Sequence, residues 1–213
     1  IDAGANIGYM TGLMAARLGA GGKVLAFEPH PKVFAELAAN LAAWSKQPIA
    51  RAIALQVALS SKSGAGRLQE PLDFDRNRGT SKLVLGEASG MHVKTVCLDE
   101  VCLKYGRADV LKVDVEGHEL EVLRGARNLL QKGALRDIIF EDQSGDVMSP
   151  LASLLSGFGH TIFSLTRTLR GPVLATRPDQ FPNVPYLPPS LLATREPLRA
   201  IGRFRAGGWL VLH

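Results

Sequence analysis

The opening of the chain carries residues whose types and spacing suit the binding of a ligand. Asp2 begins a glycine-rich stretch that reads DAGANIG and ends at Gly8. Glycines in a turn between a strand and a helix let the backbone approach a ligand closely and present amide groups at the helix N-terminus. The stretch lacks the three-glycine pattern of dinucleotide sites, which argues against a pyrophosphate ligand.

A carboxylate follows at a second suitable position. Glu28 lies directly after the apolar run KVLAF of residues 23–27, where a buried strand is predicted to end. A carboxylate at that place can accept two hydrogen bonds from a ribose diol. Asp2 beside the glycine turn favours a cationic amine. The pair therefore predicts an adenosine ligand that carries an amino acid and no phosphate, and S-adenosylmethionine is such a ligand.

The hydrophobic pattern predicts the elements that position these residues. Strands are expected over 23–27, 52–59, 92–96, 109–116, 137–142, 161–165 and 209–212. Helices are expected over 6–19, from Pro31 to before Pro48, over 99–105, from Gly117 to about Leu130, and over 150–156. Met10 and Leu18 belong to the apolar residues that recur at helical spacing in the first helix. In the second helix, one face is expected to hold Val33, Leu37, Leu41 and Trp44. Strands that alternate with helices indicate βαβ units and a mainly parallel sheet.

Two segments depart from this alternation. Residues 60–90 are rich in Gly, Ser and charge, which predicts a hairpin or loop excursion. Residues 171–207 are rich in Pro and Arg, and they are predicted to be irregular before a last strand. The length of 213 residues favours a single domain over 1–213.

Composition excludes several classes of protein. Hydrophobic residues make up 46% and charged residues 21% of the chain, and no apolar run reaches the length of a membrane span. The two cysteines exclude a disulfide scaffold and favour a reducing, cytoplasmic location. His30, His92 and His160 share no metal-ligand spacing, so no zinc site is predicted. The net charge of +5 falls in residues 160–213, which indicates either an anionic acceptor or a solvated basic face.

Five blocks, in order, resemble the FkbM-type methyltransferases of the class I S-adenosylmethionine-dependent fold. They are IDAGANIGYMT, KVLAFEPHPKVFAELAANL, CLDEV, ADVLKVDVEGHELEVLRGA and IIFE, within residues 1–141. The resemblance implies a Rossmann-like α/β fold with a mostly parallel seven-strand sheet, helices on both faces and a reversed last strand. It also implies methyl transfer to a hydroxyl of a sugar or glycan, a polyketide or another small molecule. Because only Ile1 precedes the first motif, most of the first strand is expected to be missing from this sequence.

The resemblance also implies roles for individual residues. The expected cofactor-binding residues are Asp2, Gly4, Ala5, Asn6, Gly8, Glu28, Pro29, Val57, Ala58, Asp114 and Glu116. The expected catalytic residues, as candidates for a general base, are Asp114, His118 and Glu141. Lys112, Asp114 and Glu116 alternate along one predicted strand and would share a side of it. A divalent ion held by Asp114 and Glu141 is an alternative.

Each residue also has a purely structural interpretation. Asp114 could cap the following helix, His118 could be an ordinary polar residue of its first turn, and Glu141 could face solvent. At the level of function, the Arg-rich end leaves an RNA methyltransferase as an alternative, although the absence of interleaved aromatic residues argues against a nucleic-acid partner. A scaffold of the same fold that binds cofactor without turnover is a third possibility. The acceptor, the modified position and the oligomeric state stay open.

Overall fold

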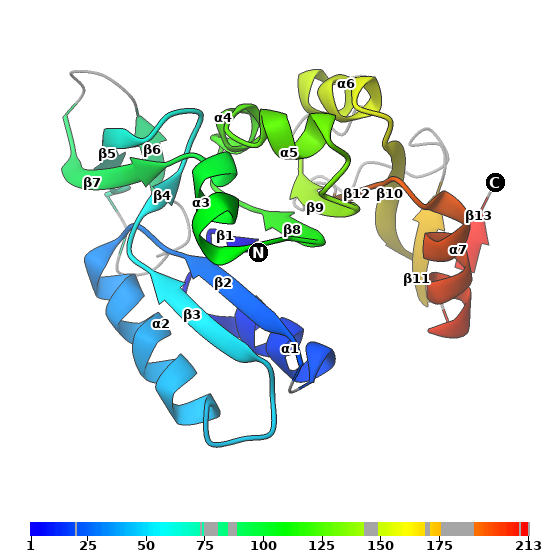
Figure 1. Ribbon diagram of the computed structural model, residues 1–213, viewed down its shortest axis with the longest axis horizontal. Coiled ribbons are helices and arrows are strands. Elements are labelled where there is room, and N and C mark those ends of the chain that lie inside the picture. Colours follow the sequence, from blue (N-terminus) through cyan, green and yellow to red (C-terminus); the bar gives the residue numbers. More distant parts are fainter. Residues whose placement is uncertain are drawn as a thin grey trace. The chain divides into compact units, whose positions relative to one another are not determined.

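A computed structural model gives the fold of this chain as two compact units. It describes residues 1–19, 21–72, 74, 81–84, 89–142, 149–168, 171–175, 190–208 and 210–212. The first unit contains residues 1–106 and 113–127, and the second contains residues 107–112 and 128–213 (Figure 1). The single domain over 1–213 stays a prediction.

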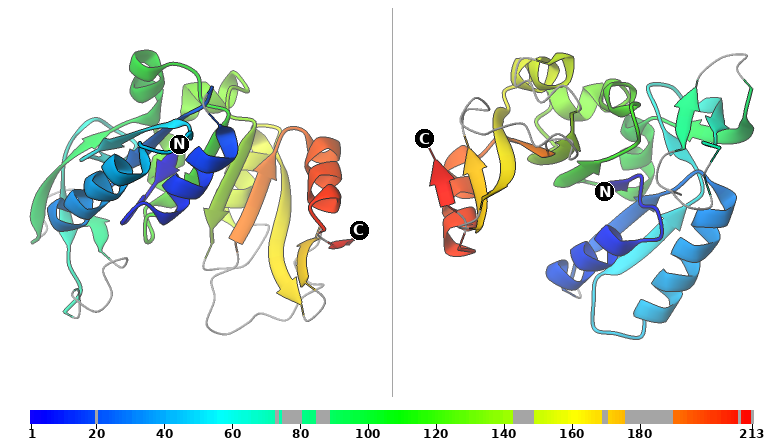
Figure 2. Two further views of the ribbon diagram at one scale, coloured as in Figure 1. Left: turned by 90° about the horizontal axis from the view of Figure 1, so that it is seen from below. Right: turned by 180° about the vertical axis from the view of Figure 1, so that it is seen from behind.

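Three parallel strands form the centre of the first unit. They are β1 (Asp2–Ala3), β2 (Lys23–Phe27) and β3 (Arg51–Leu55), in the order β1-β2-β3. The connecting helices α1 (Tyr9–Leu18) and α2 (Pro31–Trp44) lie side by side against one face of these strands (Figure 2). The apolar run KVLAF forms β2 as predicted, and from its second residue onward β2 is fully buried, as expected for a strand covered on both faces.

The buried face of α1 differs from the predicted one. Met10 and Leu18 are exposed, and the buried side chains are Thr11 and Ala15. The physical reason is close helix packing: a Cβ on Gly12 would lie 2.7 Å from the indole ring at the end of α2. Small residues therefore occupy the contact, whereas Met10 and Leu18 point outward and Met14 packs at the edge of the core. α2 follows its predicted pattern, because its predicted face is the one that the core buries.

A second, four-stranded sheet belongs to the same unit. Its strands are β4 (Ala58–Leu59), β5 (Gly64–Gln69), β6 (Lys82–Val84) and β7 (Met91–Val96), in the order β4-β7-β5-β6. β5 runs antiparallel to both β6 and β7, so residues 60–90 contribute strands to a sheet. The prediction of one strand over 52–59 is wrong. The Leu55 carbonyl accepts from the Val57 N–H at 2.9 Å, and this turn sends the chain from one sheet to the other.

Three short helices and β8 follow. They are α3 (Leu98–Tyr105), β8 (Val110–Val113), α4 (Glu119–Arg124) and α5 (Arg127–Gln131). The predicted continuous helix after Gly117 is interrupted at Gly125. The carbonyl of Gly125 accepts from the N–H of Asp99 at the start of α3, and a Cβ on Gly125 would lie 2.1 Å from the Ser60 carbonyl oxygen. Tight packing against neighbouring backbone therefore ends α4.

The second unit contains a mixed sheet. Its order is β13-β11-β10-β12-β9-β8, with β9 (Asp137–Glu141), β10 (Thr161–Thr168), β11 (Gly171–Ala175), β12 (Ser190–Thr194) and β13 (Leu210–Leu212). β12 runs antiparallel to both β9 and β10, and β10 runs antiparallel to β11. The predicted mostly parallel seven-strand sheet with one reversed last strand is therefore corrected to a mixed sheet. Three strands, β12, β11 and β13, run opposite to β9 and β10, and β12 lies between those two strands. The helix α6 (Pro150–Gly157) connects β9 to β10 along the chain.

The Pro- and Arg-rich segment is not irregular where it is described. Within 171–207 the chain forms β11, β12 and the helix α7 (Pro197–Ala206). Pro172 sits one residue inside the hairpin end of β11, and Pro197 occupies the first turn of α7, where a missing N–H does no harm. Phe163, Leu174 and Leu192 of the sheet pack against α7. Residues 176–189, which hold five of the prolines, lie outside the described residues.

None of the helices in the described part of the chain combines the length and the apolar character that a bilayer crossing requires. Both cysteines are free thiols, and both are half-buried.

Candidate functional site

The turn after β1 is built by its own backbone hydrogen bonds. Within it, each of the five amides from Gly4 to Gly8 donates inside the chain: Gly4 and Ala5 to the Phe27 carbonyl, Asn6 to Glu28 Oε2, Ile7 to Asn6 Oδ1, and Gly8 to the Ala5 carbonyl. The amides of the turn itself are therefore engaged, whereas the expectation of available amides at the helix N-terminus concerns α1 from Tyr9 onward and stays a prediction. A turn whose amides are engaged offers no anion-binding nest, which suits a ligand without phosphate.

Close approach of the chain to itself explains the first glycine. Gly4 has φ +75, and a Cβ there would lie 1.8 Å from the Asp114 carbonyl oxygen. Gly8 has φ +94, and its missing Cβ faces Leu37 of α2 at 2.7 Å. Gly4 therefore brings the turn against the end of β8, whereas Gly8 serves the packing of α1 on α2.

Asp2 is fully buried in β1, one residue before the turn. Its Oδ2 accepts a hydrogen bond from the Thr11 hydroxyl at 2.6 Å. Thr11 is also fully buried and lies in the first turn of α1. Neither the Thr11 partner nor the burial of Asp2 is predictable from the sequence pattern. The bond ties the start of α1 to the strand that precedes it.

Glu28 lies at the end of β2 and is 8% exposed. Its Oε2 accepts from the Asn6 N–H at 3.0 Å, and its Oε1 accepts from the His30 N–H at 2.9 Å. The half-buried Pro29 lies between Glu28 and His30 in the sequence. A carboxylate can accept about four hydrogen bonds, so two backbone donors are compatible with further donors from a ligand. The structure thus joins Glu28 to the glycine-rich turn.

Asp114 follows β8 and lies against the end of β1. Its N–H donates to the Ala3 carbonyl at 3.2 Å, and its carbonyl faces Gly4. Glu116 does not continue the strand, because it has a left-handed φ of 53 and β8 ends at Val113. The prediction that Lys112, Asp114 and Glu116 share one side of a strand is therefore wrong for Glu116.

Glu119 is a residue of this turn that the sequence analysis missed. Its Oε1 accepts from the N–H of Val115 at 3.2 Å and from the N–H of Gly117 at 3.1 Å, and the residue is 9% exposed. A carboxylate that accepts two backbone donors fixes the turn that carries Asp114. The available signal was an acidic residue at the start of a helix, beside the unpaired amides of its first turn.

His118 is buried directly after the same turn. Its Nε2 lies 3.0 Å from the Ser60 hydroxyl, and burial lowers the pKa of its imidazole below the usual value. The hydroxyl of Ser61, the residue after Ser60, donates to Glu121 of α4 at 2.5 Å and lowers the pKa of the Glu121 carboxyl. The imidazole of His118 is thus held toward the residues that follow β4.

Three further candidates lie at separate places. Val57 follows the end of β3, and Ala58 begins β4, where it is buried and paired with Thr95. Glu141 ends β9 and belongs to the second unit, whereas the other candidates belong to the first. No group of three His, Cys, Asp or Glu side chains that could hold a metal is found in the described ranges.

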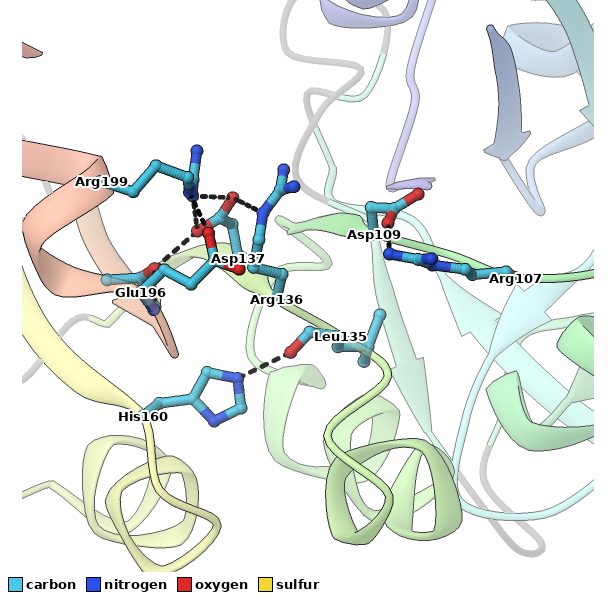
Figure 3. A network of polar contacts seen from close by, with 9 residues as sticks. Arg107, Asp109, Leu135, Arg136, Asp137, His160, Glu196 and Arg199 are labelled. Carbon is cyan, nitrogen blue, oxygen red and sulfur yellow. Dashed lines mark hydrogen bonds and ion pairs between the residues drawn. The ribbon is translucent and has the colours of Figure 1, made fainter. Parts of the chain in front are cut away.

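Arg199, one of the basic residues near the end of the chain, belongs to a network of polar contacts in the second unit (Figure 3). The buried carboxylate of Asp137 accepts from the Thr194 hydroxyl at 2.7 Å, from Arg136 Nε at 2.9 Å, and from Arg199 Nη2 at 2.5 and 2.6 Å. Burial alone would raise the pKa of Asp137, but these donors lower it. Arg199 also pairs with Glu196 at 2.6 Å. The network fastens α7 to the start of β9.

Comparisons with known proteins identify the family of this chain. Residues 2–149 match the Methyltransferase FkbM domain family. The chain is 36% identical over 157 residues to the hexuronic acid methyltransferase AglP of Haloferax volcanii, covering 73% of this chain and 60% of that protein. It is 34% identical over 155 residues to the methyltransferase sdnD of Sordaria araneosa, covering 59% of each. The chain therefore spans about 60% of the length of these curated relatives, and no solved structure gives a significant match. By the extent of the family match, this chain belongs to the FkbM methyltransferase family.

Proposed function

We propose that this chain transfers a methyl group from S-adenosylmethionine to an oxygen of a sugar or another small molecule. One observation carries the proposal. The first unit brings the glycine-rich turn, the Glu28 carboxylate and the end of β8 into one hydrogen-bonded assembly. That assembly has the carboxylate for a ribose diol and offers no amide nest for a phosphate.

Each part of the assembly has a role toward the cofactor in this proposal. Glu28 accepts the ribose hydroxyls while its two backbone donors hold it in place. The turn of residues 4–8 lines the methionine part, and Asp2 holds that turn in register through Thr11. Val57 and Ala58 lie on the adenine side, at the passage between the two sheets. Glu116 faces the same ligand from the turn after β8.

The bound cofactor supplies an electrophilic methyl group, and the protein supplies alignment and a base. The acceptor oxygen forms a bond to the methyl carbon as the carbon–sulfur bond breaks, and the hydroxyl proton passes to the Asp114 carboxylate. Asp114 is the better base because its backbone is fixed against β1 at the edge where ligands of such sheets bind. His118 is a weaker candidate, because its Nε2 already bonds to Ser60.

The name of one relative suggests a chemical class for the acceptor. A hexuronic acid offers both hydroxyl and carboxylate oxygens. A hydroxyl acceptor requires a base for its proton, whereas a carboxylate acceptor carries no proton to remove at neutral pH. Transfer to a hydroxyl gives an ether and transfer to the carboxylate gives an ester. If turnover depends on Asp114, the acceptor oxygen is therefore that of a hydroxyl and not of a carboxylate.

Transfer of a tritiated methyl group from S-adenosylmethionine into pooled glycans, RNA and protein tests the proposal. We expect label in the glycan or small-molecule fraction, and resistance of that label to mild alkali identifies an ether. Alkali-labile label would move the acceptor from a hydroxyl to a carboxylate. Label in RNA would replace the proposal with the RNA methyltransferase, and tight S-adenosylhomocysteine binding without any transfer would leave the non-catalytic scaffold.

A further inference from the structure

The ring of His30 is buried beside the site without belonging to it. His30 is 1% exposed, and it lies two residues after Glu28 at the start of α2. Its Nε2 lies 2.7 Å from Glu70 Oε1, and its ring stacks on Phe74 with centroids 4.3 Å apart. Glu70 and Phe74 both belong to the segment after β5, in the second sheet region.

A direct line of contacts runs from this ring to Glu28, the carboxylate proposed to bind the cofactor. The His30 N–H donates to Glu28 Oε1 at 2.9 Å, and the other oxygen of Glu28 accepts from Asn6 at 3.0 Å. Nδ1 of the ring accepts from the Val33 N–H, so the ring proton lies on Nε2 and is donated to Glu70. The ring is therefore held on both nitrogens and on one face. Its fixed position fixes the backbone amide that holds Glu28.

We propose that Glu70 and Phe74, acting through His30, are positioning residues that aim the Glu28 carboxylate at the ribose diol. This inference rests on the proposed function, because it needs Glu28 to bind the ribose. It assigns a role to Glu70 and Phe74, which follow β5. Two neighbours then position the Glu28 carboxylate. The glycine-rich turn donates to one of its oxygens, and His30 donates to the other.

The exposure of Glu70 makes this contact accessible to mutation. The Glu70 side chain is 39% exposed, so its replacement leaves the core packing unchanged. Glu70→Ala removes the acceptor for His30 Nε2, whereas Glu70→Gln keeps an oxygen acceptor at the same distance. Glu100→Ala is a matched control, because Glu100 is a carboxylate of the same unit whose exposed bond to the Ser63 hydroxyl lies outside this line.

Calorimetric affinity for two ligands separates positioning from general stability. The first ligand is S-adenosylhomocysteine, and the second is its analogue without the two ribose hydroxyls. We expect Glu70→Ala to weaken the first by about 3-fold to 10-fold, as coupled neighbours do, and to leave the second unchanged. Glu70→Gln and Glu100→Ala should match the wild type for both ligands. In turnover, the KM for the cofactor should rise in Glu70→Ala while kcat stays the same.

The remaining outcomes overturn the inference in distinguishable ways. Equal weakening of both ligands by Glu70→Ala would show a structural role and reject ribose positioning. A Glu28→Ala variant that loses the preference for the hydroxylated ligand, beside a Glu70→Ala variant that keeps it, would reject the inference alone. A wild type that does not bind S-adenosylhomocysteine would reject both the inference and the proposed function.

Discussion

At the residue scale, the candidate site contains non-glycine residues whose backbone is in the left-handed region. Among the residues that the structure describes, Asn6 and Glu116 are the non-glycine residues with left-handed φ. Each lies in a turn that a buried carboxylate holds: Glu28 bonds the N–H of Asn6, and Glu119 bonds the amides on either side of Glu116. Such conformations persist only where the surroundings over-determine them. The two turns are thus preorganised before any ligand binds.

The base should be Asp114. Asp114→Asn keeps the shape of the side chain and removes its basicity, so we expect turnover with a hydroxyl acceptor to fall about 10²-fold to 10⁴-fold. Affinity for S-adenosylhomocysteine should change far less. His118→Asn should lower turnover to a smaller extent, because its ring nitrogen is engaged by Ser60. Turnover near the wild-type value in Asp114→Asn would transfer the search for the base to Glu141.

Gly4 should be the least replaceable glycine of the first turn. Gly4→Ala adds a left-handed alanine, which costs about 1–2 kcal/mol, and places its Cβ 1.8 Å from the Asp114 carbonyl oxygen. Gly208→Ala is a matched control, since Gly208 has φ +82 and a Cβ there would meet nothing within 4 Å. In denaturant unfolding, Gly4→Ala should lose clearly more free energy of unfolding than Gly208→Ala. Equal losses would show that the end of β8 can move away from the turn.

At the element scale, hydrophobic periodicity predicted the elements better than it predicted their faces. The apolar run of β2 and the face of α2 are as predicted, because large side chains there fill the core. α1 has the opposite arrangement, since the approach of α2 selects small residues such as Gly12. The change of sheet after β3 depends on one turn at Leu55, which leaves no pattern in the sequence. The hydrophobic pattern of a segment therefore predicts its buried face where large side chains fill the core. Where a neighbouring element packs closely, that neighbour determines which residues are buried.

The candidate site was predicted from motif position more fully than from side-chain patterns. Asp2, Glu28 and Asp114 are brought together with the glycine-rich turn in one unit. Their actual partners, Thr11 for Asp2 and His30 for Glu28, were not predictable, because hydrogen bonds between elements depend on packing distances. The second sheet region fastens both site turns through buried histidines, with His30 bonded to Glu70 and His118 bonded to Ser60.

Arg199 should account for much of the attachment of α7. Arg199→Ala removes two charge-assisted hydrogen bonds from the buried Asp137, which keeps its bonds from Arg136 and Thr194. Because Arg199 is partly exposed, we expect a loss of about 1–3 kcal/mol in the free energy of unfolding. Arg203→Ala, on the same helix and exposed, should change it by less than about 0.5 kcal/mol. A neutral Arg199→Ala would mean that apolar packing alone holds the helix.

At the scale of the whole molecule, the uneven charge serves internal structure as well as the surface. Residues 160–213 hold seven Arg against Asp179 and Glu196. Arg195 donates to the Phe158 carbonyl at 2.6 Å, and Arg199 belongs to the Asp137 network. Part of the basic excess is therefore fixed within the second unit. The two alternatives for this end of the chain, an anionic acceptor or a solvated face, apply to the other arginines.

In each unit, burial or pairing lowers the pKa of one histidine and of one carboxylate, and all four groups respond to acid in the same direction. Burial lowers the pKa of His118 in the first unit and of His160 in the second below the usual 6.5. Asp137 and Glu121 also have lowered pKa values, the first despite its burial. The unfolded chain then binds protons more tightly than the folded one. Stability is accordingly complete above the unfolded pKa of each group and is lost as pH falls through its folded pKa.

We therefore expect the melting temperature to fall when pH decreases from about 7 to 5, where histidines titrate, and to fall further near pH 4, where carboxylates titrate. His160→Asn should flatten the first step, because the variant has no imidazole to protonate on unfolding. His92→Asn, at an exposed position of β7, should leave that step as in the wild type. Thermal unfolding followed by circular dichroism across this range provides the measurement. A melting temperature that is constant or rises from pH 7 to 5 would contradict the assignment, since it requires histidines that bind protons at least as tightly in the folded chain.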